Sequence, residues 1–151
     1  MRLVIQRVRE ASVEVGQQEV ARIGPGLVVL VGFTVQDDPK EFSRIAKMIV
    51  QLRLFDDSAS HLNRSLAQTS REVLVVPEIT LVASLAKGTR PSFDPAAPLE
   101  QAKALFEAFV QSIAAIHPRV AAGVFQAHMV VRLANDGPVT FVLDPSTRPT
   151  A

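Results

Sequence analysis

Two short segments made only of apolar residues constrain the fold of this chain most. Leu27–Phe33 and Val73–Val76 contain no polar side chain, which is typical of strands that are covered on both faces. Turn residues bound them, with Gly24-Pro25-Gly26 before the first segment and Pro77 after the second. Neither approaches the roughly 20 apolar residues that a membrane helix needs. The sequence therefore predicts a sheet with buried central strands.

Further strands and two helices are expected around these segments. Helical spacing of apolar residues follows Asp38-Pro39, a cap and a first helical position. A second helix is expected from Leu99 to Ile116, ended by Pro118. The other expected strands are Leu3–Val15, Glu19–Ile23, Arg53–Phe55, His128–Ala134 and Val139–Leu143, and Ile79–Ala83 is expected to resume extended structure.

The pattern predicts an α/β fold class with one domain. Strands outnumber helices, and the hairpins imply a mostly antiparallel sheet packed on two flanking helices. We expect the domain to span residues 1–145 and residues 146–151 to form a flexible tail. No linker or repeat divides the 151 residues, a length typical of a single domain.

Composition excludes several classes of site. The chain has no cysteine, so it has neither disulfides nor zinc–thiolate sites. His61, His117 and His128 are far apart and lack a carboxylate at metal-ligand spacing, so we expect neither a metal nor a cofactor. A net charge of +1 does not fit a protein that holds nucleic acid by charge alone, so any RNA would need a local site. The strand pattern starts at once, so we expect no signal peptide and a cytoplasmic location.

Three motifs stand out from this background. They are Ile5-Gln6-Arg7-Val8, Lys87-Gly88-Thr89-Arg90-Pro91-Ser92-Phe93 and Asn135-Asp136-Gly137-Pro138-Val139-Thr140. Each has a simple structural interpretation: an arginine that snorkels at the end of a sheet, a solvated loop, and an ordinary turn between two strands. Phe125 and Met129, four residues apart, are equally compatible with a place in the core.

Together these motifs resemble the D-aminoacyl-tRNA deacylases, from Met1 to about Asp144. The resemblance implies a barrel-like sheet and a homodimer whose active sites lie at the subunit interface. It also implies hydrolysis of the ester bond of D-aminoacyl-tRNA and glycyl-tRNA, with rejection of L-aminoacyl groups. Aminoacyl-tRNA is the implied partner, and neither DNA nor a membrane is expected.

The resemblance also assigns roles to residues. Gly137 and Pro138, joined by a cis bond, would reach into the partner's site, where their carbonyl oxygens would collide with an L-side chain but not with a D-side chain. Arg7 would tether this segment through hydrogen bonds to its backbone. Asn135, Val139 and Thr140 complete the motif and, with Phe125 and Met129, belong to the implied substrate site. Lys87 and Arg90 would lie where the tRNA acceptor end arrives.

One motif departs from the family pattern. Where the family usually has Ser-Gln-Phe-Thr, this chain has Pro77-Glu78-Ile79-Thr80. In the family, the 2′-hydroxyl of the terminal adenosine helps to activate water and backbone amides hold the ester carbonyl, so the amides of Ile79 and Thr80 would serve here. Pro77 has no N–H to offer. The Glu78 carboxylate would either repel phosphate or pair with the α-ammonium group of the substrate.

This departure leaves three functions open. The first is a divergent member of the D-specific deacylases, which we favour because Asn135–Thr140 keeps the form of that class. The second is a tRNA-binding paralogue that has lost catalysis. The third is a hydrolase or binding protein for small amino-acid esters, with Glu78 as a base or as the ammonium partner.

Overall fold

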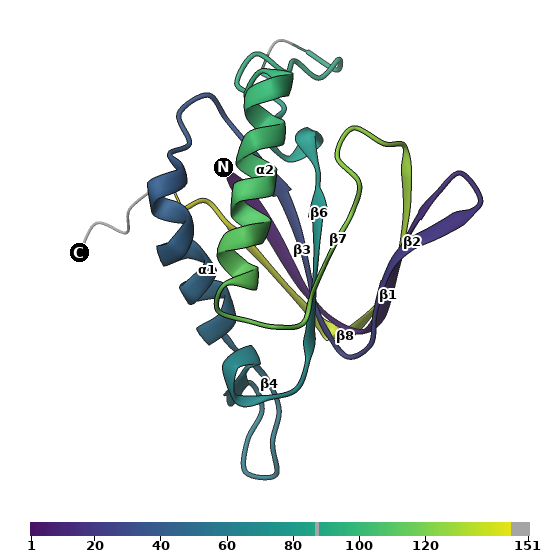
Figure 1. The fold of residues 1–151 in the computed structure, drawn as a ribbon, viewed down its shortest axis with the longest axis vertical. Helices are drawn as coiled ribbons and strands as arrows, with labels where there is room; N and C mark the ends of the chain where they lie inside the picture. The colour runs from purple at the N-terminus through teal and green to yellow at the C-terminus, as the bar shows by residue number, and fades with distance from the viewer. Residues whose placement is uncertain (87, 146–151) are drawn as a thin grey trace.

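A computed structural model describes residues 1–86 and 88–145 of the chain. Its main sheet has the strand order β2-β1-β3-β6-β7, and β8 pairs with the other edge of β1 (Figure 1). The six strands are β1 (Arg2–Val15), β2 (Gln18–Ile23), β3 (Gly26–Gly32), β6 (Glu72–Pro77), β7 (Val120–Ala122) and β8 (Met129–Leu143). The predicted tail, residues 146–151, lies outside the described residues.

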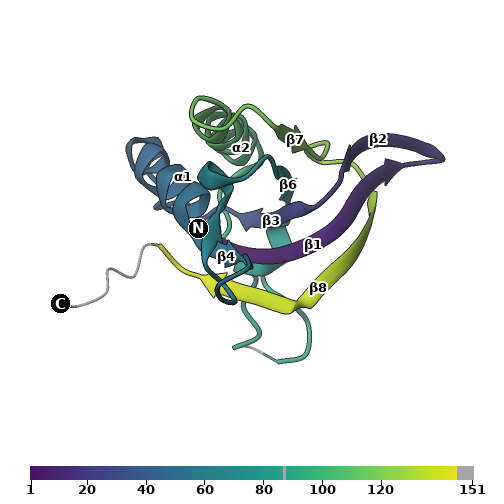
Figure 2. The same ribbon diagram turned by 90° about the horizontal axis from the view of Figure 1, so that it is seen from below.

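Strand β1 organises the sheet because it pairs with three other strands. Its first half pairs with β3 and its second half with β2, while β8 follows it over nearly its whole length. These pairs are antiparallel, whereas β3–β6 and β6–β7 are parallel. Figure 2 shows the sheet curling into a nearly closed barrel with both helices on one side. The predicted α/β barrel-like fold is therefore confirmed.

The two all-apolar strands lie between two cores, as predicted. Val29 and Val75 point into the core that α1 (Phe42–Gln51) and α2 (Leu99–Ala114) cover. Val28 and Leu74, one position along, point into the interior of the curled sheet. Successive side chains of a strand face opposite sides, so both faces of β3 and β6 must be apolar. No helix in residues 1–86 or 88–145 is both long and apolar enough to cross a membrane.

The remaining elements are short. They are the 3₁₀ helices η1 (Pro39–Glu41), η2 (Leu66–Gln68) and η3 (Ile79–Val82), and the two-stranded sheet of β4 (Arg53–Phe55) and β5 (Arg64–Ser65). Asp38 caps η1 as predicted, accepting a hydrogen bond from the Lys40 amide at 2.9 Å, and the α-helix follows it. Strand β7 was not predicted, because three residues are too few to show a period.

One predicted strand and one predicted turn are wrong. Ile79–Ala83 is not extended, because the Glu78 side chain accepts the Thr80 amide and starts the 3₁₀ helix η3. His128–Ala134 and Val139–Leu143 are not separate strands joined by a turn but parts of β8. Both parts pair with β1 rather than with each other, so the chain continues in one direction.

Candidate functional site

The centre of β8 carries a bulge. Gln6 of β1 pairs with Thr140 and Val8 pairs with Asn135, so residues 136–139 lie opposite Arg7 alone. Four residues facing one cannot stay in the ladder, and the strand bends there. We call residues 136–139 the β8 bulge. Gly137 and Pro138 are exposed on it, and the peptide bond between them is cis.

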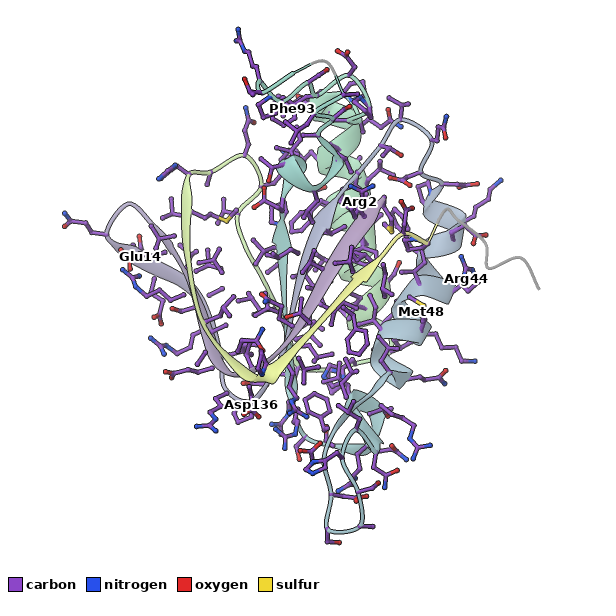
Figure 3. All side chains as sticks on the ribbon, turned by 180° about the vertical axis from the view of Figure 1, so that it is seen from behind. Arg2, Glu14, Arg44, Met48, Phe93 and Asp136 are labelled. Atoms are coloured by element: carbon purple, nitrogen blue, oxygen red, sulfur yellow. The ribbon has the colours of Figure 1, made fainter. Side chains whose placement is uncertain are left out.

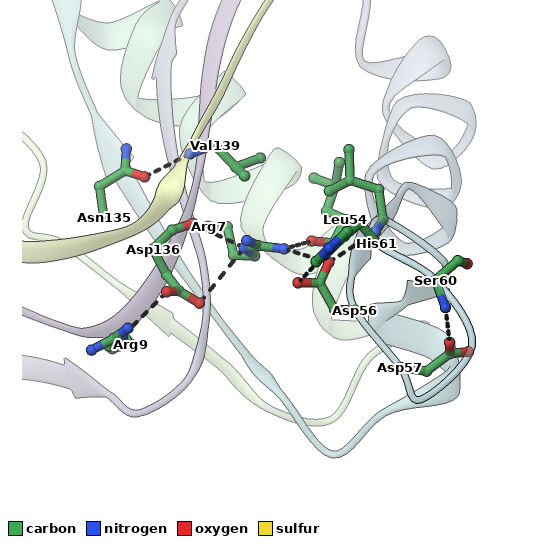
Figure 4. Close-up of polar contacts among 11 residues, drawn as sticks. Arg7, Arg9, Leu54, Asp56, Asp57, Ser60, His61, Asn135, Asp136 and Val139 are labelled. Atoms are coloured by element: carbon green, nitrogen blue, oxygen red, sulfur yellow. Dashed lines mark hydrogen bonds and ion pairs between the residues drawn. The ribbon is translucent and has the colours of Figure 1, made fainter.

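Arg7, on the neighbouring strand β1, holds the β8 bulge in place. Its side chain is buried, with 8% of the residue exposed, and its Nε donates to the Asp136 carbonyl oxygen at 3.0 Å. Its Nη1 donates to the Leu54 carbonyl at 2.8 Å and to Asp56 Oδ1 at 3.2 Å (Figure 4). Arg7 is therefore not a snorkelling side chain, since its charged head contacts the protein. The planar guanidinium connects β8 to the end of β4.

Basic and acidic side chains around Arg7 form ion pairs. Arg9 donates to Asp136 at 3.2 Å, and His61 Nδ1 lies 3.1 Å from Asp56. The pKa of Asp56 is lowered to about 2, first by the hydrogen bond from the Leu62 amide, then by His61 and Arg7. Asp56 is therefore a carboxylate at neutral pH, and two cations face two anions beside the bulge.

Asn135 closes the β8 bulge from its own strand. Its side-chain oxygen accepts the Val139 amide at 2.9 Å, spanning the four bulged residues. Its amide nitrogen donates to Thr140 Oγ1 at 3.0 Å, which also accepts from Gln6 at 3.2 Å. The bulge is thus held at both ends by side chains of the predicted motif.

A second group of predicted residues meets at the other end of the sheet. Glu78 and Ile79, with Phe125, line an apolar pocket of about 130 Å³ together with Leu99 and Ala102 of α2. We call this the strand-end pocket, since it follows the last residue of β6. Gly32 allows the close approach that forms it, because a Cβ there would lie 2.7 Å from the Glu78 carbonyl oxygen.

The Glu78 carboxylate occupies the first turn of η3. It accepts the Thr80 amide at 3.2 Å, and the Thr80 hydroxyl donates to the same oxygen. The first amides of a helix lack partners within it, so they attract an anion. The Thr80 amide is therefore available to another acceptor only when the carboxylate moves aside. Ile79 is half exposed at the pocket.

Phe125 and Met129 have different surroundings. Phe125 lines the strand-end pocket, with its ring centroid 6.0 Å from that of Phe106 on α2. Met129 packs against the core inside the curled sheet, and its sulfur would lie 3.0 Å from a Cβ at Gly123. Only Phe125 therefore faces the pocket directly.

The predicted basic loop runs between η3 and α2. Ser84 and Ser92 pair across its base, and Arg90 lies exposed between them. Lys87 lies outside the described residues. Figure 3 shows Phe93 of this loop near the upper end of the molecule, above Arg2.

The β8 bulge and the strand-end pocket are far apart within one chain. Arg2 pairs with Gly32 beside the pocket, whereas Arg7 holds the bulge. Arg7 is five residue steps along β1 from Arg2, or about 16 Å at roughly 3.3 Å per residue. Figure 3 shows Arg2 and Phe93 toward one end of the molecule and Asp136 at the other. A single chain therefore does not bring the predicted site residues together.

Several contact residues were missed by the sequence analysis. Asp56 and His61, the partners of Arg7, lie in a polar stretch without a motif. A buried arginine requires acceptors, so the Asp56-Asp57 pair after a short strand was an available signal. Ala97, Leu99 and Ala102 of the strand-end pocket are too ordinary to be found by pattern. Within the described residues, no group of three or more His, Asp or Glu side chains is arranged to hold a metal.

Comparison with known proteins identifies the family of this chain. Residues 4–144 match the family model described as D-Tyr-tRNA(Tyr) deacylase. A D-aminoacyl-tRNA deacylase of Nitrosococcus oceani is 49% identical, covering 93% of this chain and 90% of that protein. One of Opitutus terrae is 48% identical, covering 98% and 99%.

Solved structures agree with the sequence comparison. A protein described as c-Myc DNA Unwinding Element Binding Protein is 36% identical, with a TM-score of 0.90, and the match covers 95% of this chain and 98% of that one. A probable eukaryotic D-amino acid tRNA deacylase shares the fold at a TM-score of 0.80 with 16% identity, covering 94% and 97%. The chain therefore belongs to the D-Tyr-tRNA(Tyr) deacylase family.

Proposed function

We propose that this protein hydrolyses the ester bond between a D-amino acid, or glycine, and the 3′ end of tRNA, and that it rejects L-aminoacyl groups. The observation that carries the proposal is the β8 bulge. It exposes Gly137 and Pro138, is fixed by Arg7 and Asn135, and lies about 16 Å along β1 from the strand-end pocket. A rigid projecting segment of this kind is suited to enter a site on another molecule.

That other molecule is a second copy of the chain. In an isologous dimer the same surface of each protomer contacts the other, so a bulge from each would enter the partner's pocket. Exposed apolar side chains on β8 support this arrangement, because Val130, Phe141 and Val142 are 41%, 39% and 66% exposed. Apolar side chains in a row on one strand favour burial against a partner.

Chirality is then selected by exclusion. The bulge backbone stands where the α-carbon of the aminoacyl group would bind, so a side chain on the L-side collides with it. A hydrogen or a D-side chain points away from it. Rigidity matters for this mechanism, because a flexible bulge would move aside and admit the L-enantiomer. The bonds from Arg7 and Asn135 supply that rigidity.

The strand-end pocket would hold the ester end of the substrate. The amides at Ile79 and Thr80 would stabilise the tetrahedral intermediate once the Glu78 carboxylate is displaced from Thr80. Arg90 and Lys87, on the loop after η3, would meet the phosphates of the acceptor end. The terminal adenosine and the incoming water would lie between the strand-end pocket and this loop.

Deacylation of D-Tyr-tRNA, Gly-tRNA and L-Tyr-tRNA by the purified protein tests the proposal. We expect turnover of the first two substrates and none of the third. Gly137→Ala should lower kcat/KM for D-Tyr-tRNA at least tenfold. Gly137 has φ +133°, and a Cβ there would lie 2.7 Å from Val139 Cγ2, so the bulge must shift.

Gly16→Ala is the matched control. Gly16 also has a positive φ, +63°, but no atom lies within 4 Å of an added Cβ. It should cost stability without changing kcat/KM. Absence of turnover with all three substrates, with tRNA still bound, would contradict the proposal and leave the tRNA-binding paralogue. Equal turnover of L-Tyr-tRNA would contradict the chirality screen.

A further inference from the structure

A second, larger groove lies at the end of the sheet opposite the strand-end pocket. It has a volume of about 700 Å³ and begins beside Glu72, the first residue of β6. Arg64, Arg71 and Arg119 line it, and we call it the arginine groove. Three segments bring these arginines together: β5, the approach to β6, and the connection from α2 to β7, which is distant from the other two in sequence.

These three arginines differ from most others in the chain. Arg2, Arg7, Arg9, Arg22, Arg44 and Arg132 all form ion pairs with Asp or Glu. Within the described residues, Arg64, Arg71 and Arg119 have no such ion pair. The chain carries a net charge of only +1, and three arginines without an ion pair gather in this one groove.

Contacts that leave the charge intact hold the three side chains. Arg64 donates to the Gln68 carbonyl oxygen, and Arg119 Nη1 donates to the Ser70 carbonyl oxygen at 2.9 Å. The Arg71 guanidinium carbon lies 4.6 Å from the centroid of the Phe55 ring. An arginine fixed by a carbonyl or a ring keeps its full charge and is preorganised for a planar, bidentate partner.

Negative charge at the arginine groove is limited. Among the residues that the structure describes, Glu72 is the one carboxylate that lines it, and its Oε2 accepts the Gly24 amide. Asp57 lies near Arg64 but is held mainly by amides, and its pKa is lowered first by Ser60 and Ala59 and least by Arg64. Three cations and one amide-bound carboxylate therefore leave a net positive groove.

We infer that the arginine groove is a second binding site for the phosphodiester backbone of the tRNA substrate, separate from the site where the ester is hydrolysed. This inference rests on the proposed function for the identity of the polyanion. Arginine forks suit phosphate oxygens, and an open, polar groove suits a chain that lies across it. The groove would position the tRNA body without reading its sequence.

The position of the groove sets how it assists. Strand β6 separates Glu72 at the groove from Pro77 at the strand-end pocket by about 16 Å. A small substrate held in the pocket does not reach the groove, whereas a tRNA extends well past it. The groove therefore contributes to the binding of tRNA and not to the reaction of an aminoacyl-adenosine.

The test compares two double variants that remove the same charge. Arg64→Gln/Arg119→Gln empties the groove of its two exposed arginines, and Arg22→Gln/Arg44→Gln removes two ion-paired arginines elsewhere. The measurements are the Kd for uncharged tRNA across a salt series, and kcat/KM for D-Tyr-tRNA and for D-tyrosyl-adenosine.

For the groove variant we expect the Kd for tRNA to rise roughly tenfold at 0.1 M salt. The slope of log Kd against log salt should fall by about 1.5, as for two lost phosphate contacts. kcat/KM should fall for D-Tyr-tRNA and stay within about twofold for D-tyrosyl-adenosine. An unchanged Kd and slope, or changes equal to those of the control variant, would overturn the inference.

Two further readings separate the possible failures. If the wild type turns over neither substrate, the proposed function fails, while the Kd and the salt slope still decide whether the groove binds tRNA. If thermal unfolding shows that the double variant is destabilised, Arg64→Gln alone is used. Its side chain is exposed and bonds only to a carbonyl, and the expected loss of slope is then about 0.8.

Discussion

At the scale of single residues, Arg7 fixes the position of the β8 bulge. Its guanidinium is buried, yet it donates to two backbone carbonyls and a carboxylate, so burial leaves its donors partnered. A lysine has one ammonium group and cannot reach β8 and β4 in the same plane. An arginine on an apolar strand face is thus explained by its acceptors, which come from elsewhere in the chain.

Glu78 is the residue whose chemistry departs most from the family pattern, and its substitution gives a clear prediction. Glu78→Gln should raise kcat/KM for D-Tyr-tRNA about fivefold, because a neutral amide binds the Thr80 N–H more weakly, by about 1 kcal/mol, and yields it to the substrate. Deacylation at saturating and limiting substrate separates an effect on kcat from one on KM.

Glu107→Gln serves as the control for the loss of one negative charge, since this exposed residue of α2 lies away from the pocket lining. It should leave both constants unchanged. A fall in kcat/KM for Glu78→Gln would contradict the prediction. That result would instead support the other hypothesis for Glu78, in which its carboxylate pairs with the α-ammonium group of the substrate.

At the scale of elements, β8 shows how a strand can carry a projecting segment without ending. Both of its halves remain in the ladder with β1, and the four bulged residues are bridged by one side chain, Asn135. The bulge therefore keeps its shape through contacts within its own strand as well as through Arg7. Removing the bridge should loosen the bulge while the ladder persists.

Asn135→Ala is expected to lower the free energy of unfolding by about 1 kcal/mol, since the Val139 amide loses its acceptor. The fall in kcat/KM for D-Tyr-tRNA should be larger, about tenfold, because position matters more to the reaction than to stability. Chemical denaturation and deacylation measure the two effects. Asn135→Asp keeps the acceptor oxygen and should retain most of the stability; equal losses in both variants would contradict the role of this bond.

The sequence predicted the elements better than their connections. Leu27–Phe33 and Val73–Val76 were predictable because strands buried on both faces have a clear signature. The continuity of β8 was not, since Asn-Asp-Gly-Pro favours a turn locally and only pairing with β1 reveals a bulge. Likewise, Ile79–Ala83 was predicted to be extended, whereas the side-chain cap at Glu78 starts the 3₁₀ helix η3 there. Phe125 was found by its motif, whereas Ala102 opposite it carries no signal.

At the scale of the whole molecule, the β8 bulge and the strand-end pocket, which we propose to form one site, lie far apart within one chain. Mixed dimers test whether they meet between protomers. Gly137→Ala disables the bulge, and Ala102→Leu fills the strand-end pocket. Each variant alone should be nearly inactive on D-Tyr-tRNA. An equal mixture, unfolded and refolded together, should recover about a quarter of wild-type activity, because half of the dimers are mixed and each contains one intact site.

The control mixture combines two bulge variants, Gly137→Ala and Asn135→Ala, which share the same defect and should show no recovery. Sedimentation confirms that dimers form in every mixture. No recovery in the first mixture, with dimers present, would show that the bulge acts within its own chain, and the proposed arrangement across the interface would be wrong.

Strand β1 has a consequence for how the family can vary. Arg2 bonds to the Leu81 carbonyl at 3.0 Å beside the strand-end pocket, and Arg7 bonds to the Asp136 carbonyl at the bulge. The length of one uninterrupted strand therefore fixes the spacing between the strand-end pocket and the β8 bulge. In the proposed dimer it would also fix the spacing between the two active sites. Homologous chains should accept insertions at the Gly16 hairpin or near His61 but not between residues 2 and 7, where one added residue would turn every later side chain to the opposite face.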